Sequence, residues 1–271
     1  MTVMPLLAAG ALFMAAAMGF AWLAQFRSGN AGWVDVVWTL GTGATGAGFA
    51  LIPGPGLEIG PRQIVIAFLA AIWSLRLALH IALRVAHGPE DARYANLRRD
   101  WGGAFQTRMF WFLQAQAACT LVLASAILLA ARNPAPALRP LDLLGVLVMA
   151  AAVLGERAAD RQLARFKATR GGRKRICDAG LWGWSRHPNY FFEWLGWLAY
   201  PLMALGPDYP WGWAAFAAPA LMYAILVHGT GIPTVEAQML RSRGAAFRRY
   251  QARVSAFLPL PPGRRPEGAR R

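Results

Sequence analysis

The sequence predicts an all-α integral membrane protein with seven transmembrane helices, an outside N-terminus and a cytoplasmic C-terminus. Three observations support this fold class. Of the 271 residues, 56% are hydrophobic and 15% are charged, which is too apolar for a soluble domain of this size. Seven apolar stretches approach the ~20 residues that a helix needs to cross the hydrocarbon core. The basic residues between these stretches alternate between a charge-rich and a charge-poor side of the membrane.

Each predicted span is an apolar run of nearly membrane-crossing length. In chain order the runs occupy residues 4–26, 32–52, 64–85, 109–131, 141–159, 190–205 and 211–232. The first run is expected to remain as a helix, because no basic region precedes it and it is longer than the core of a signal peptide. The sixth run is short, so its polar start is expected near the membrane surface.

The Lys and Arg residues orient these helices, because loops rich in them stay in the cytoplasm. Only Arg62, Arg132 and Arg139 lie in loops on the predicted outer side. The predicted cytoplasmic segments contain 24 Lys and Arg residues and comprise residues 27–31, 84–108, 156–189 and 233–271.

The polar segments are too short for an independent soluble fold, so residues 1–258 are expected to form a single membrane domain. Residues 259–271, rich in Pro, Gly and Arg, are expected to be a disordered basic tail. The net charge of +15 is tethered between apolar spans, which favours anionic lipid headgroups or an anionic cofactor over nucleic acid. No internal repeat supports a transporter with inverted halves.

The third predicted span carries a row of polar residues. Its members are spaced three or four residues apart, which places them on one helix face; they are Trp73, Arg76, His80, Arg84 and His87. A charge in hydrocarbon costs at least ~2.5 kcal/mol, so the row requires an anionic partner. Alternatively, Arg84 and His87 reach the lipid headgroups while Arg76 pairs with Asp35 of the second span.

Asp35 is therefore either a proton donor in a water-poor cavity or half of a buried ion pair. A G-x-G-x-x-G pattern at residues 41–46 follows in the same span. No strand precedes it, so it indicates close helix packing rather than dinucleotide binding. The loop after the third span mixes charges with an aromatic residue, which indicates an ordered surface loop; these residues include Glu90, Asp91, Arg93 and Tyr94.

A second polar cluster follows the fifth span. Glu156, Asp160 and Lys167 continue its helical period to a stop at 171–172. Pro188 then suits the first turn of a helix, whose unpaired N–H groups attract phosphate or carboxylate. The alternative interpretation is that the basic residues of this segment only bind the headgroups of anionic lipids. Four scattered histidines and two separated cysteines lack metal-ligand spacing, so no metal is expected.

The string GLWGWSRHPNYFFE at 180–193, with 155–160 before it and 231–236 and Tyr250 after it, resembles the steroid 5α-reductase family. The bacterial membrane branch of that family is the most similar. Its RHPNY core is also similar to the isoprenylcysteine carboxyl methyltransferases of the same superfamily. The resemblance implies a seven-helix enzyme of the bacterial inner membrane that holds NADPH in a cytoplasm-facing cavity and reduces an enone of a steroid-like lipid.

The resemblance also implies residue roles. Lys167 and Arg175 would bind phosphate, and Asn189 and Glu193 would lie near the nicotinamide amide and ribose. The full implied cofactor-binding set is Arg76, His80, Arg84, Glu156, Asp160, Lys167, Arg175, Arg186, His187, Asn189, Tyr190, Glu193, Glu236 and Tyr250.

The catalytic half departs from the family pattern. The steroid reductases hold the substrate carbonyl with a Gln-Glu pair on the second helix and a Tyr on the third. Here Asp35 and Trp73 stand in those helices and are the catalytic candidates. The leading hypothesis is NADPH-dependent reduction of a carbon–carbon double bond conjugated to a carbonyl in a hydrophobic lipid. The alternatives are S-adenosylmethionine-dependent methylation of a membrane lipid or prenylated acceptor, and a non-catalytic lipid-binding or transport protein.

Overall fold

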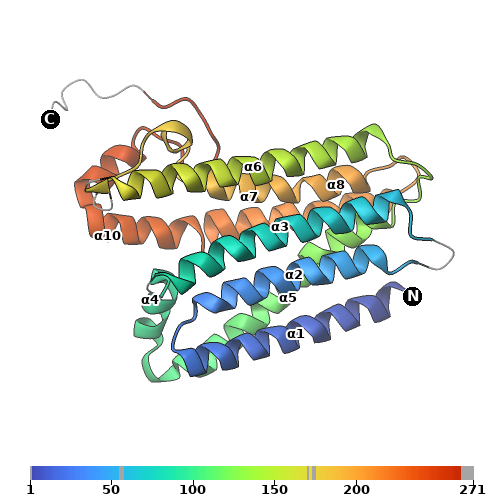
Figure 1. The fold of residues 1–271 in the computed structure, drawn as a ribbon, viewed down its shortest axis with the longest axis horizontal. Coiled ribbons are helices and arrows are strands. Elements are labelled where there is room, and N and C mark those ends of the chain that lie inside the picture. Colours follow the sequence, from blue (N-terminus) through green and yellow to red (C-terminus); the bar gives the residue numbers. More distant parts are fainter. Residues whose placement is uncertain (1, 55–57, 89, 170, 173–174, 264–271) are drawn as a thin grey trace. The chain divides into compact units, whose positions relative to one another are not determined.

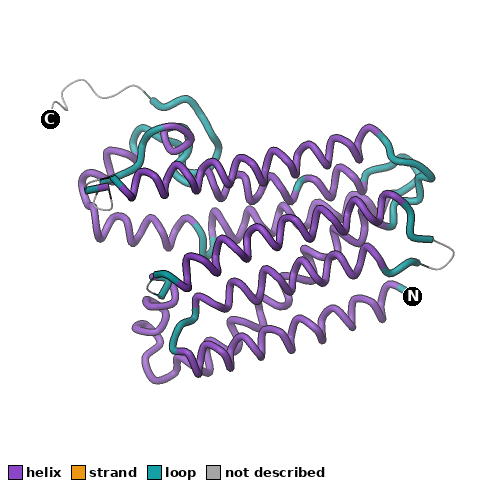
Figure 2. The backbone as a smooth tube through the Cα atoms, viewed as in Figure 1, coloured by secondary structure: helices purple, strands orange, loops and turns teal. Residues whose placement is uncertain are grey.

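The computed structural model describes residues 2–54, 58–88, 90–169, 171–172 and 175–263. All regular elements in these ranges are helices (Figure 2), which confirms the all-α prediction for them. The chain divides into two compact units. Unit 1 comprises Met1–Val146 and Leu198–Leu221, and unit 2 comprises Leu147–Trp197 and Met222–Arg271.

Unit 1 is built on four long helices: α1 (Val3–Ser28), α2 (Gly32–Leu51), α3 (Pro61–Ala86) and α5 (Phe105–Ala131). Helix α2 contacts the other three (Figure 1). The polar loop after α3 forms the short helix α4 (Ala92–Trp101), followed by the turn η1 (Gly102–Ala104). Helix α8 (Ala199–Ala204) and the 3₁₀ helix η4 (Pro210–Phe216) pack against α5.

Small residues allow α2 to lie close to its neighbours. A Cβ atom on Gly43 would collide with the side chain of Ser74 on α3, and one on Gly46 would collide with Ile127 on α5. The G-x-G-x-x-G pattern is therefore a helix-packing surface, as its membrane context indicated.

Unit 2 combines the end of a long helix with a polar C-terminal part. Helices α6 (Pro140–Ala168) and α9 (Ala217–Tyr223) both begin in unit 1 and end in unit 2. The elements wholly in unit 2 are η3 (Gly180–Gly183), α7 (Pro188–Trp197), the π-helical turn η5 (Ala224–His228) and α10 (Ile232–Gln251).

The segment after α10 runs beside the segment before α7. Ser185 and Ser255 form an isolated parallel bridge, and Arg186 donates its backbone N–H to the Ser255 carbonyl at 2.8 Å. Farther along, the Leu260 N–H donates to the Trp184 carbonyl at 3.0 Å. The first residues of the predicted disordered tail thus have ordered contacts, whereas residues 264–271 lie outside the described ranges.

Four helical stretches of the described chain are long and apolar enough to cross a membrane, as expected for an integral membrane protein: Val3–Ser28, Pro61–Ala86, Arg93–Ala131 and Pro210–Gln251. The charges of the last stretch follow Ile232, so its apolar part precedes α10. Helix α6 is long, but charges flank its apolar middle at Asp142 and at Glu156. Seven spans and the orientation of the termini remain predictions.

The predicted span 190–205 is interrupted in the structure. Helix α7 ends at Trp197 and α8 starts at Ala199. Pro201 explains the break, because it has no N–H to donate to the carbonyl four residues earlier.

Candidate functional site

The Asp35 carboxylate in the first turn of α2 is held by two neighbouring residues of α4. Its Oδ1 atom accepts a hydrogen bond of 2.7 Å from the Tyr94 hydroxyl. Its Oδ2 atom accepts one of 2.5 Å from the Arg93 guanidinium. Tyr94 is 1% exposed, so this hydroxyl lies in the unit 1 core rather than at the surface. The pair places an acidic group and a phenol together in apolar surroundings.

The interaction continues away from the core through a second carboxylate. Arg93 Nε lies 3.2 Å from Asp91 Oδ1, and Arg84 of α3 lies 3.2 Å from Asp91 Oδ2. Asp91 also caps α4 by accepting the Arg93 backbone N–H at 2.9 Å. Burial by itself would raise the pKa of Asp91, but the Arg93 and Arg84 charges and the capping hydrogen bond together lower it below its ordinary value.

The row on α3 passes gradually from the core to the surface. Trp73 is buried and Arg76 is half-buried, whereas His80, Arg84 and His87 are exposed. The anion that contacts Arg84 is Asp91. Asp35 therefore belongs to an ion-paired network, but its partner is Arg93 of α4 rather than the Arg76 that the ion-pair hypothesis expected.

Glu236 of α10 is the centre of the polar cluster in unit 2. Arg186 donates to both of its carboxylate oxygens, at 2.7 and 3.2 Å. The ring Nε2 of His187 lies 3.1 Å from Oε1, and the Gln251 amide donates to Oε2 at 2.7 Å. Arg186 also donates to the carbonyls of Gln251 and Val254. These contacts connect the segment before α7 to the end of α10.

Two buried hydroxyls fix the same connection. The Ser185 hydroxyl donates to the Phe257 carbonyl at 2.8 Å and accepts the His187 N–H at 3.1 Å. The Tyr250 hydroxyl donates to the Trp182 carbonyl at 2.5 Å. Trp182 in turn donates its indole N–H to the Ala159 carbonyl of α6 at 2.9 Å.

Helices α6 and α7 present polar side chains to the interior of unit 2. Glu156 and Glu193 are 6% and 8% exposed. Asn189 donates to Asp160 at 3.5 Å, and Trp197 donates to Glu193 at 3.1 Å. A Tyr190 ring stacks on His187 with 5.5 Å between centroids, which places it beside the Glu236 cluster.

The remaining predicted residues are cations at the surface. Lys167 near the end of α6 is exposed, and so is Arg175, whose guanidinium lies 5.8 Å from the Phe166 ring centre. Residues 170 and 173–174, between them, lie outside the described ranges. By sequence, unit 2 contains 18 of the 28 basic residues and 6 of the 13 acidic residues, and so carries +12 of the net charge of +15.

A family model described as a protein of unknown function, DUF1295, matches residues 21–254. The chain belongs to the DUF1295 family. No curated protein and no solved structure matches it. The DUF1295 match includes the Asp35 network of unit 1 and the Glu236 cluster of unit 2, so both polar sets lie within the family region.

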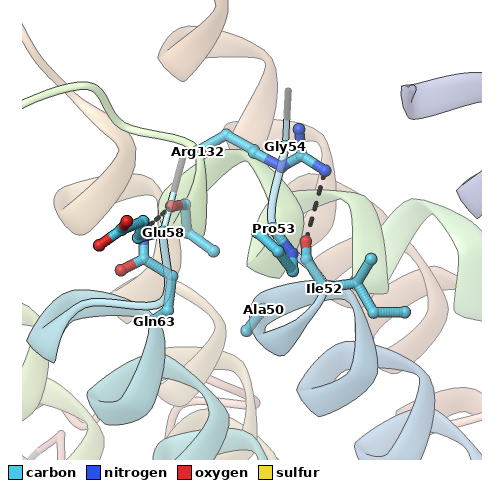
Figure 3. A pocket seen from close by; sticks show the side chains of 8 residues that line it. Ala50, Ile52, Pro53, Gly54, Glu58, Gln63 and Arg132 are labelled. Carbon is cyan, nitrogen blue, oxygen red and sulfur yellow. Dashed lines mark hydrogen bonds between the residues drawn. The ribbon is translucent and has the colours of Figure 1, made fainter. Parts of the chain in front are cut away.

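This DUF1295 chain also has a small recess at the opposite end of α2 from Asp35 (Figure 3). It has a cavity volume of about 10 Å³, and the Arg132 side chain on its rim donates to the Ile52 carbonyl at 3.5 Å. This volume is below the ~300 Å³ at which ligand pockets begin, so the recess does not suit a dinucleotide or a lipid ring system.

Two residues of the DUF1295 site were not among the predicted catalytic candidates. Arg93 and Tyr94 contact Asp35 across 58 and 59 positions of sequence. Their mixed charge and aromatic character indicated an ordered loop, but no periodicity links that loop to the start of α2.

Within the described chain, no group of three His, Cys, Asp or Glu side chains is arranged to hold a metal.

Proposed function

We propose that this protein is an NADPH-dependent membrane oxidoreductase that reduces a carbon–carbon double bond conjugated to a carbonyl in a hydrophobic, steroid-like lipid. The observation that carries the proposal is the Asp35–Tyr94 pair, in which an acid on the apolar helix α2 and a buried phenol on α4 are joined at 2.7 Å. A lipid enone needs such a group to donate a hydrogen bond to its carbonyl oxygen while the β-carbon accepts a hydride.

Tyr94 is the proposed proton donor, and Asp35 positions it. The Asp35 carboxylate accepts hydrogen bonds from both the Arg93 guanidinium and the Tyr94 hydroxyl, and these two contacts hold the phenol in place. When a carbonyl oxygen approaches, the Tyr94 O–H turns from Asp35 to that oxygen and protonates it as negative charge develops. The surrounding buried methionine and aromatic side chains exclude water from this step.

Unit 2 is the proposed cofactor-binding part, and its charge supports that role. NADPH carries a pyrophosphate and a 2′-phosphate, which match a unit with a net charge of +12. Lys167 and Arg175 are exposed cations that can reach phosphates. Asn189, Asp160 and Glu193 offer an amide and carboxylates for ribose hydroxyls and the nicotinamide amide. When bound, NADPH supplies the hydride.

The Glu236 cluster has a positioning role in this proposal. Arg186 and His187 already contact Glu236, so they orient the start of α7 rather than neutralise a phosphate. The same charge balance argues against S-adenosylmethionine, whose methyl-donating sulfonium is itself a cation. The proposal includes seven spans in a bacterial inner membrane and a cytoplasm-facing active site, supported by the distribution of Lys and Arg.

Binding tests the cofactor class directly. Full-length protein in detergent is titrated with NADPH and with S-adenosylmethionine while tryptophan fluorescence is recorded. Saturable binding of NADPH alone supports the proposal, binding of S-adenosylmethionine alone replaces it with methyl transfer, and binding of neither indicates a non-catalytic protein. The variant Arg99→Ala removes an exposed arginine of unit 1. Its NADPH affinity, compared with that of the unchanged protein, shows the effect of lowering the net charge by one.

Turnover then tests the reaction. Oxidation of NADPH is followed with a panel of lipid enones in proteoliposomes, and the saturated ketone is identified by mass spectrometry. Product formation that requires both NADPH and the conjugated carbonyl supports the proposal. Equal reduction of isolated double bonds would contradict it, because those substrates develop no enolate charge for Tyr94 to protonate.

A further inference from the structure

The C-terminal half of α6 has two chemically distinct faces. Arg157, Arg161 and Arg165 are spaced four residues apart, so at 100° per residue they lie within ~80° of one another. All three side chains are exposed. Glu156 and Lys167 lie on the other side of the helix, where Glu156 is buried inside unit 2. The arginine row thus lies on a different face of the helix from Glu156 and Lys167.

The three arginines are exposed cations on the surface of α6. Across the described ranges of the chain, none of them takes part in an ion pair. Each arginine is followed by the next after ~6 Å of helix axis, so the row extends over ~12 Å. A row of this kind presents planar guanidinium groups suited to phosphate oxygens.

The same face of α6 is apolar just before the arginine row. Leu147 and Leu154 are 57% and 65% exposed, and helical spacing places both in line with the arginines. The face therefore changes from exposed leucine to exposed arginine within three residues, along one continuous helix (Figure 1). Such a change is expected where hydrocarbon gives way to lipid headgroups, because arginine extends its charged group toward the surface.

We propose that Arg157, Arg161 and Arg165 form a binding surface for the phosphates of anionic phospholipids. The leucines fix its depth at the edge of the hydrocarbon layer, and the three charges select lipids with a net negative headgroup. This surface is independent of the proposed oxidoreductase activity, because it lies on the face of α6 that Lys167 does not share.

The experiment measures lipid affinity. Full-length protein in a neutral detergent is titrated with short-chain phosphatidylglycerol, and bound lipid is counted by native mass spectrometry. Each Arg→Gln change in the row is expected to weaken binding about fivefold, and the triple variant R157Q/R161Q/R165Q on the order of a hundredfold. The matched control R241Q/R248Q/R249Q removes three exposed arginines of α10 and should retain most of the affinity.

Three outcomes would overturn the proposal. Equal loss in the two triple variants would show that net charge, not the row, attracts the lipid. Equal binding of phosphatidylcholine would show that no anionic headgroup is selected, and displacement by inorganic phosphate at equal concentration would assign the row to a soluble anion. The single variant Arg161→Gln, with the charge-retaining Arg161→Lys beside it, gives the fivefold test if the triple variant does not fold.

Discussion

Removal of one oxygen atom from Tyr94 separates a catalytic role from a structural one. Tyr94→Phe deletes the hydroxyl that donates to Asp35 at 2.7 Å and leaves the ring in a core position that is 1% exposed. The change should cost about 1.5 to 3 kcal/mol of folding free energy, the value of a hydrogen bond to a charged group. The Arg93 contact still satisfies the carboxylate, so the lower end of this range is expected.

The effect on turnover should be much larger than the effect on stability. Loss of a general acid typically lowers kcat by 10² to 10⁴. NADPH affinity should stay within a few-fold, because the loss falls on the transition state and not on cofactor binding. The assay combines enone-dependent NADPH oxidation, NADPH titration and denaturant unfolding on the same preparation.

One control variant and two possible outcomes make this prediction decisive. Tyr209→Phe removes the same atom from a half-buried tyrosine of unit 1 that is distant in sequence from Asp35, and should change neither stability nor turnover. A Tyr94→Phe protein with normal kcat would refute the proton-donor assignment. Parallel loss of kcat and NADPH affinity in Tyr94→Phe would instead show that the hydroxyl only supports the fold.

Other changes test the remaining contacts. Glu236→Gln leaves Arg186, which is 11% exposed, without its counter-charge. This should lower the free energy of unfolding, measured with denaturant, by about 3 to 5 kcal/mol. Adding Arg186→Met should recover part of that stability, and additive losses in the double variant would contradict the pairing. Lys167→Ala and Arg175→Ala should weaken NADPH binding about tenfold or more and NADH binding less, measured by titration; equal losses would assign these residues to the pyrophosphate. Because the folded-state pKa of Asp91 is lowered, its stabilising contribution is present above about pH 4 and is lost as the pH falls through that lowered pKa. Thermal unfolding should show this acid loss, and Asp91→Asn should reduce it.

The long helices could be predicted from the sequence because hydrocarbon thickness sets their length. Helix α1 extends the predicted run 4–26 by only a few residues, and α2 ends one residue before the predicted boundary. Apolar content alone could not locate the break between α7 and α8. That break depends on a single missing N–H at Pro201, which barely changes the mean hydropathy of the run.

The partners of buried charges were the least predictable part. Helical periodicity places Asp35 and Arg76 each on a face of its own helix, but it does not say which helix packs against that face. In the structure the Asp35 carboxylate is instead bound by α4, a short helix whose mixed charged and aromatic residues indicated only an ordered surface loop. When a loop folds back onto a membrane helix, its hydrogen-bond donors reach that helix through a tertiary contact. Residue spacing within either segment does not predict such a contact.

The predicted cofactor residues of unit 2 fall into two groups according to their burial. A carboxylate and a guanidinium that have lost most of their water depend on each other, because removing one leaves the other charge without a counter-ion. Glu236 therefore engages Arg186 in a two-oxygen contact and holds His187 beside it, and these groups cannot also neutralise a phosphate without breaking that contact. Lys167 and Arg175 are instead exposed at the surface, where an incoming phosphate can reach them. Under the proposed function, phosphate binding is therefore expected of the surface cations and helix positioning of the Glu236 cluster, because the two sets differ in burial although both contain basic residues.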